Sequence, residues 1–149
     1  MVWVKRVMGV VLICMAVWLT KPLWSRSEPL DPQRIAAQLA AAKAAGQPVL
    51  LDFYADWCPP CKEMERVTFP DPRVQERLAK LVFIKVDLTR KGSPDVEALM
   101  REYAIRAVPT YVFLDATGRE LTEHRQGGFI APEGFAALLD KVLAAAGTR

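Results

Sequence analysis

Two cysteines separated by two prolines stand where an apolar segment ends and a helix is predicted to begin. Residues 49–54 form a continuous apolar run broken only by Asp52, which is typical of a strand buried on both faces. Cys58 and Cys61 follow this run, and their i, i+3 spacing on the first helical turn brings both sulfurs within bonding distance. The prolines occupy the opening helical positions, where a missing N–H costs least. A dithiol in this position is suited to making and breaking disulfides.

The predicted helix start makes the first cysteine the more reactive of the pair. Unpaired amides and the positive end of the helix dipole favour a thiolate at Cys58. Because the prolines cannot donate, Cys61 is the first residue of the turn whose amide can reach the Cys58 sulfur. Cys58 is therefore the predicted nucleophile.

A zinc site and a structural disulfide are the other uses of such a pair. Structural zinc needs four ligands, and the remaining candidates are Cys14, inside an apolar run, and His124, far along the chain. A structural disulfide across so short a loop stabilises a fold little. We therefore expect neither a metal nor a cofactor, and we interpret His124 as a solvated strand residue rather than a ligand or base.

The N-terminus carries a targeting signal. Lys5 and Arg6 precede an apolar run over residues 7–19, which is typical of an export signal or a membrane anchor. The run is short for a membrane span, but no Ala-x-Ala-like cleavage site follows it, and Trp18 and Trp24 are placed as interface anchors. An uncleaved anchor is the interpretation that we favour.

This signal divides the chain into a membrane anchor over residues 1–24, a linker over 25–30 and one domain over 31–149. Basic residues flank the apolar run on both sides, so the positive-inside bias specifies orientation only weakly. With the N-terminus inside, which is the default for a short signal anchor, the domain lies in the bacterial periplasm at the inner membrane.

Charge gives no reason to expect a nucleic-acid partner. The chain has 20 basic and 17 acidic residues and a formal net charge of +3. Removing the four basic residues of the N-terminal segment, at positions 5, 6, 21 and 26, leaves 16 basic against 17 acidic residues, or about −1. A near-neutral domain lacks the basic surface that nucleic acids require.

Hydrophobic periodicity and turn residues predict alternating helices and strands after the linker. The expected helices cover residues 32–46, 59–69, 73–78, 94–103 and 132–142, and the expected strands cover 49–54, 81–87, 111–114 and 120–127. Alternation of this kind predicts a parallel sheet covered by helices, with the last two strands forming an antiparallel hairpin.

Two carboxylates lie near the dithiol in the sequence. Asp52 interrupts the buried strand six residues before Cys58, and because burial disfavours a charge we expect its pKa to be raised. An exposed position near the strand end is the alternative. Glu65 lies four residues after Cys61 on the same helical face, where it either tunes the buried thiol or pairs with Lys62 in solvent.

These segments resemble a known family. The motif Trp57-Cys58-Pro59-Pro60-Cys61-Lys62 after a buried strand, with Val108-Pro109-Thr110 before another, is similar to thioredoxin-fold oxidoreductases. More narrowly, residues 54–74 resemble the C-terminal periplasmic domain of the DsbD thiol:disulfide interchange proteins, within a likeness that covers about 49–143. The resemblance implies a thioredoxin-like α/β/α sandwich with a mixed sheet.

The resemblance also implies roles for single residues. Cys58 and Cys61 match the redox pair, and Asp52 and Glu65 match two acidic residues that lie near that pair and tune it. From its own sequence context Pro109 is only a proline that opens a strand.

In the family, however, the proline at this position has a cis peptide bond, and its loop lies against the dithiol and binds the backbone of a partner. The resemblance therefore makes Pro109 a substrate-binding residue, together with its neighbour Val108 and with Trp57 beside the dithiol.

Two departures from the family pattern bear on function. The prolines between the cysteines are more like those of tryparedoxins, so the redox potential of the DsbD family is not carried over. The chain also lacks the multi-span membrane domain and the N-terminal domain of DsbD, so we expect its electron donor to be a separate protein in the membrane or a thioredoxin-like one.

The predicted function is that of a membrane-anchored thiol–disulfide reductase acting on protein disulfides. Three alternatives stay open at this point. The domain could reduce apocytochrome c before haem attachment, or it could be an oxidase, since direction depends on potential and electron supply. It could also be a non-catalytic binding module, with Trp57, Phe129 and the Pro109 loop lining an apolar docking surface.

Overall fold

The computed structural model of the protein describes residues 32–89 and 94–147. The predicted anchor over residues 1–24 and linker over 25–30 lie outside this part of the chain. Within the described residues, no helix combines the length and the apolar character needed to span a membrane.

The described elements form an α/β/α sandwich around a four-stranded mixed sheet. In chain order they are α2 (Pro32–Ala44), β1 (Val49–Tyr54), α3 (Pro59–Glu63), η2 (Met64–Thr68), α4 (Pro72–Leu78), β2 (Val82–Asp87), α5 (Pro94–Glu102), β3 (Thr110–Leu114), η3 (Thr122–His124), β4 (Gln126–Gly127) and α6 (Pro132–Gly147). The strand order is β2-β1-β3-β4, with β1 parallel to β2 and antiparallel to β3. The sheet is therefore mixed, as the resemblance implies. The alternation of elements predicts antiparallel pairing for the last two strands only, whereas β3 is also antiparallel to β1.

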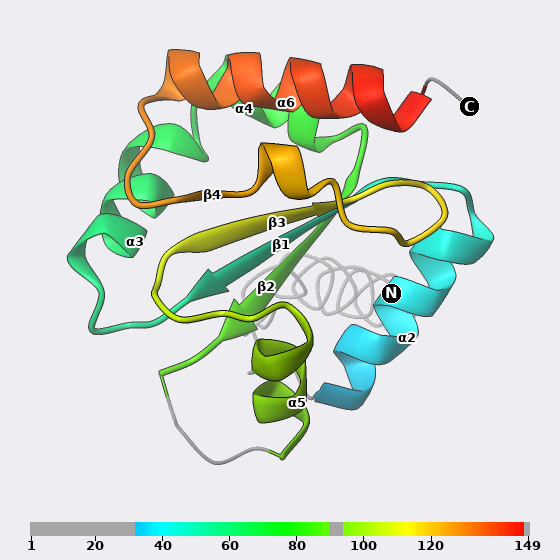
Figure 1. Ribbon diagram of the computed structural model, residues 1–149. Helices are drawn as coiled ribbons and strands as arrows, with labels where there is room; N and C mark the ends of the chain where they lie inside the picture. The colour runs from blue at the N-terminus through cyan, green and yellow to red at the C-terminus, as the bar shows by residue number, and fades with distance from the viewer. Residues whose placement is uncertain (1–31, 90–93, 148–149) are drawn as a thin grey trace, which may run out of the picture.

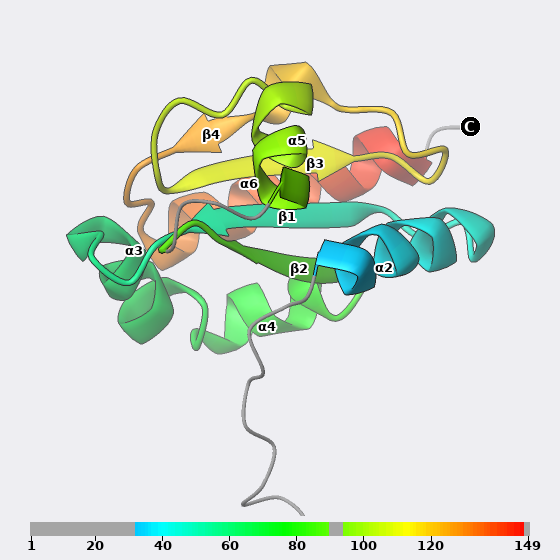
Figure 2. The same ribbon diagram turned by 90° about the horizontal axis from the view of Figure 1, so that it is seen from below.

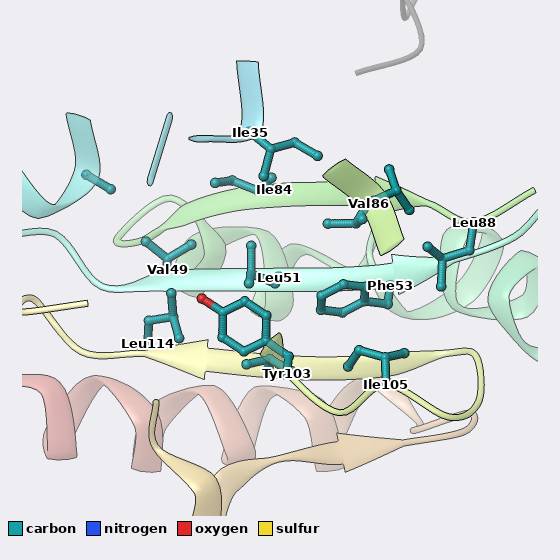
Figure 3. Packing of buried hydrophobic residues seen from close by; sticks show 13 residues of the cluster. Ile35, Val49, Leu51, Phe53, Ile84, Val86, Leu88, Tyr103, Ile105 and Leu114 are labelled. Atoms are coloured by element: carbon teal, nitrogen blue, oxygen red, sulfur yellow. The ribbon is translucent and has the colours of Figure 1, made fainter. Parts of the chain in front are cut away.

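Helices cover both faces of the sheet, as Figures 1 and 2 show. Strand β1 buries Val49, Leu51 and Phe53 against the side of α2 and α5. Figure 3 shows this cluster, in which Ile35 lies on the side of Ile84 from β2. The centroid of the Tyr103 ring lies 6.1 Å from that of the Phe53 ring. The intervening Leu50 faces a second cluster formed with α4 and α6. Because successive side chains of a strand point to opposite faces, a strand buried on both sides is apolar throughout, which explains the continuous run in the sequence.

The prediction of a strand over residues 120–127 is wrong for most of that segment. Only Gln126–Gly127 pairs with β3, and Glu120 makes a single isolated bridge to Leu114. Between them Thr122–His124 forms a turn of 3-10 helix. The physical reason is composition, because Leu121 is the one buried hydrophobic side chain between positions 120 and 127 and no alternation holds the segment in a sheet.

An ion pair helps to hold this segment out of the sheet. The guanidinium of Arg125 donates to the carboxylate of Glu120 at 2.7 and 2.9 Å and to the carbonyl of Tyr103 at 2.7 Å. His124 consequently lies on η3 and not on a strand, and its side chain is only 17% exposed, with Nε2 3.7 Å from the carboxylate of Glu123. The interpretation of His124 as a solvated strand residue is therefore wrong in both respects.

Candidate active site

The cysteine pair lies at the start of α3, where the chain leaves β1 at one end of the sheet (Figure 1). Cys58 is the N-cap, with an extended backbone, and the two prolines occupy the first two helical positions. The amide of Cys61 donates to the Sγ of Cys58 at 3.3 Å, as predicted from the missing proline donors. The two cysteines form a disulfide, with their Cα atoms 5.3 Å apart.

Both cysteines are buried, at 2% and 3% exposure, in a small apolar cluster with Ala55. Val108 packs against this cluster from the loop before β3. The neighbouring Trp57 is 65% exposed. A large apolar side chain therefore stands in solvent next to a disulfide that is itself shielded.

The loop before β3 has the geometry that the resemblance implies. The Val108–Pro109 peptide bond is cis, and Pro109 is buried. Since Val108 contacts the cluster around the cysteines, this loop and the dithiol lie side by side although they are far apart in the chain. Trp57, Val108 and Pro109 are thus gathered near the disulfide, and substrate binding by them stays a prediction.

Two glycines at the end of β4 lie against this loop. The amide of Gly128 donates to the carbonyl of Pro109 at 3.1 Å, and Gly128 has a φ of +80°, which favours glycine. A Cβ on Gly127 would lie 3.1 Å from the same carbonyl oxygen, so a side chain there would push the loop away by a few tenths of an ångström. From the sequence, these glycines mark only the end of the strand predicted over residues 120–127. Consecutive glycines beside a strand were the signal of a close backbone approach.

Asp52 lies in the middle of the sheet, in register with Lys85 on β2 and with Tyr111 on β3. It is 2% exposed, which excludes the exposed alternative. Burial is the main effect and raises its pKa to about 7. The charge of Lys85 lowers this pKa, and the charge of Glu65 raises it. The expected rise is confirmed, and its dominant cause is loss of solvation.

The partner of Glu65 is neither a cysteine nor Lys62. Its carboxylate forms an ion pair with the ammonium of Lys85, whose Nζ also lies 4.2 Å from the centre of the Tyr54 ring. Lys85 was missed at the level of sequence. A lysine inside an otherwise apolar strand was the signal that could have found it.

Glu65 is brought towards β2 by an irregular helix. After α3 the helix changes to π-helical hydrogen bonding, in which the amide of Phe69 donates to the carbonyl of Met64 at 2.8 Å. A π-helical turn rotates the residues that follow relative to an α-helix and is frequent at functional sites. The same turn is attached to the loop after β4, because the hydroxyl of Thr68 donates to the carbonyl of Ile130 at 2.6 Å.

Comparison with known proteins identifies the family. The thioredoxin-like domain family matches residues 35–143. The chain belongs to this family. It is 38% identical over 147 residues to the thiol:disulfide interchange protein DsbD of Klebsiella pneumoniae, an alignment that covers 90% of this chain and 24% of the relative. It is 45% identical over 106 residues to DsbD of Ralstonia nicotianae, covering 71% of this chain and 17% of the relative.

The chain therefore spans about a quarter or less of the length of these relatives. Among solved structures, the C-terminal domain of Neisseria meningitidis DsbD in the reduced form matches with a TM-score of 0.66 and 30% identity, covering 74% of this chain and 96% of that one. A thioredoxin from Thermus thermophilus matches with a TM-score of 0.64 and 29% identity, covering 75% and 85%. The similarity thus extends to proteins named for thiol:disulfide interchange and, among solved structures, to the C-terminal domain of one DsbD.

The burial of Asp52 predicts a stability that depends on pH. An aspartate in an unfolded chain titrates near pH 4, whereas Asp52 in the fold titrates at about 7. Between these values the unfolded chain has released a proton that the folded protein keeps, so stability falls as pH rises through this window and levels off above it. Asparagine does not titrate. The free energy of unfolding of Asp52→Asn, relative to that of the wild type, should therefore rise across this window by roughly 4 kcal/mol. The measurement is urea unfolding of the oxidised protein at several pH values.

Asp56 is the matched control for this prediction, because it is exposed on the loop that follows β1. Asp56→Asn keeps the Asp52 carboxyl, so its stability should fall across the window as that of the wild type does. A difference for Asp52→Asn that is equally large at both ends of the window would contradict a buried carboxyl that titrates near neutrality.

Proposed function

We propose that this protein is a thiol–disulfide reductase, held by its N-terminal segment at the periplasmic face of the inner membrane. The observation that carries the proposal is the buried Cys58–Cys61 pair at the start of α3, with the Cys61 amide directed at the Cys58 sulfur. Val108, which packs against the pair from the loop before β3, supports the same chemistry. Its substrates are protein disulfides, and its electrons come from a separate protein.

The first step is attack by Cys58. In the reduced protein the Cys61 amide and the helix start stabilise a thiolate at Cys58. This thiolate attacks one sulfur of the partner disulfide, and the bond between the two partner sulfurs breaks. A mixed disulfide between Cys58 and the partner forms, and the second partner sulfur leaves as a thiolate, which takes a proton.

The second step releases the partner. Cys61 gives its proton to the Asp52 carboxylate and attacks the Cys58 sulfur, which breaks the mixed disulfide and expels the remaining partner thiolate. The protein ends with a Cys58–Cys61 disulfide, and two electrons have passed to the partner. A carboxyl with a pKa of about 7 suits this role, because near neutral pH it is about equally able to accept a proton and to return it.

The exposed indole of Trp57 and the loop of Val108 and Pro109 form the docking surface in this proposal. Trp57 offers apolar contact area next to Cys58, and its large exposed fraction of 65% leaves it available to a partner. Val108 lies against the buried cysteines. A partner segment laid along this loop would present its disulfide to Cys58.

Replacement of each cysteine separates the two steps. Cys58→Ser should abolish reduction of a protein disulfide such as those of insulin, because no nucleophile remains. Cys61→Ser should still attack but cannot resolve, so it should accumulate a mixed disulfide with its partner, seen as an added mass on a non-reducing gel or by mass spectrometry. Disulfide reduction at the wild-type rate by Cys58→Ser would contradict the mechanism.

The reduction potential decides the direction of transfer. For a reductase we expect the Cys58–Cys61 couple to lie near the thioredoxin end of the scale, at about −270 mV. The measurement is an equilibrium titration of the soluble domain against glutathione and dithiothreitol. A value near the strongly oxidising end, about −120 mV, would assign the chain to disulfide formation instead.

Attachment to the membrane rests on the basic and apolar segment at the N-terminus. The full-length chain, expressed in a Gram-negative host, should sediment with the membranes and be digested by protease added to spheroplasts. The matched control lacks residues 1–24 and carries a cleavable export signal, and it should be recovered in the soluble periplasmic fraction. Recovery of the full-length chain in the soluble fraction would contradict an uncleaved anchor.

A further inference from the structure

Tyr111 on β3 lies opposite Asp52 on β1. The two residues are register partners in an antiparallel pair, so their side chains extend from the same face of the sheet. Tyr111 is 0% exposed and Asp52 is 2% exposed. Two polar side chains are therefore buried next to each other, on the strand that leads to the dithiol and on the strand that follows the Pro109 loop.

The hydroxyl of Tyr111 is a buried group without a hydrogen-bond partner among the described residues. Such groups are rare in folded proteins, because burying a hydroxyl without a partner loses its hydrogen bonds to water. Packing alone does not call for the hydroxyl. The Tyr111 ring makes edge contacts with the rings of Phe135 and Phe69, at centroid distances of 5.5 and 6.4 Å, and a phenylalanine would fill the same space.

The surroundings of Asp52 supply charges but no hydrogen-bond donor that governs its ionisation. Lys85 on β2 is the cation that faces it, and Glu65 on η2 is paired with that cation. Tyr54 lies two residues along β1, on the same face, under the Lys85 ammonium. Burial and the charge of Asp52 raise the pKa of Tyr111, so its hydroxyl keeps its proton and is available as a donor. The hydroxyl of Tyr111 is therefore a donor without an acceptor among the described residues, on the strand position opposite a buried carboxyl.

We propose that Tyr111 is a positioning residue for Asp52: its hydroxyl donates through one buried water to the ionised carboxyl and orients it. This orientation serves the transfer of the Cys61 proton, a role that rests on the proposed function. Tyr111 touches neither the cysteines nor the partner in this arrangement. It acts through Asp52, because a donor to a carboxylate stabilises the charged form.

The test is the titration of Asp52 in Tyr111→Phe, followed by the NMR signal of its carboxyl carbon in the oxidised and reduced protein. Loss of the donor should move the midpoint of Asp52 upward by about one pH unit, a tenfold change in proton affinity. Tyr103→Phe is the matched control, because Tyr103 is also buried but packs in the cluster on the opposite face of the sheet. In Tyr103→Phe, the titration curve of Asp52 should coincide with that in the wild type.

An unchanged Asp52 midpoint in Tyr111→Phe, accompanied by a higher melting temperature, would overturn the proposal. That result would mean that the hydroxyl is simply an unsatisfied group whose removal stabilises the fold. The NMR titration does not depend on catalysis. It therefore tests the role of Tyr111 as a donor to Asp52 even if the protein proves not to reduce disulfides.

A second readout connects the pair to the reaction. In single-turnover reduction of a protein disulfide, the pH midpoint of the resolving step should shift upward in Tyr111→Phe. In an Asp52→Asn background the same substitution should leave the pH profile where it is, because the group through which Tyr111 acts is gone. An equal shift in both backgrounds would contradict a role through Asp52.

Discussion

Strand β1 lies between β2 and β3 with helices on both faces, so every one of its side chains but the last is buried. Burial on both sides decides three things at once. It anchors the strand at the centre of the domain, it holds the start of α3 and the cysteines at a defined place beyond the strand end, and it removes Asp52 from water. A carboxyl in this position has a pKa of about 7, because burial in the centre of the sheet deprives its charged form of solvation.

The site itself is assembled from segments that only the fold brings together. Cys58 and Cys61 come from the start of α3, and Val108 reaches them from the loop before β3. β4 approaches that loop closely at Gly127, where a Cβ would lie only 3.1 Å from the carbonyl oxygen of Pro109. The charge that opposes the burial of Asp52 comes from a third strand, through Lys85. The dithiol, the loop of Val108 and Pro109, and a buried carboxyl are thus positioned by one sheet.

Much of this organisation was predictable because it depends on short stretches of sequence. The dithiol at a helix start, the amide of Cys61 directed at Cys58 and the buried strand before them follow from local composition and spacing. The raised pKa of Asp52 follows from a carboxylate inside an apolar strand. The cis bond before Pro109 was expected from family resemblance alone, since the local sequence indicates no more than a strand start.

The sequence by itself determined that residues 49–54 form a buried strand and where the helix with the cysteines begins, because those features depend on composition within about ten residues. Only the tertiary structure decided that Glu65 pairs with Lys85, that Asp52 faces Tyr111, and that residues 122–124 leave the sheet. These pairings follow from strand order and register, in which a shift of one residue would turn every side chain of a strand to the other face. Local periodicity gives the faces of each element but not the neighbours that those faces meet.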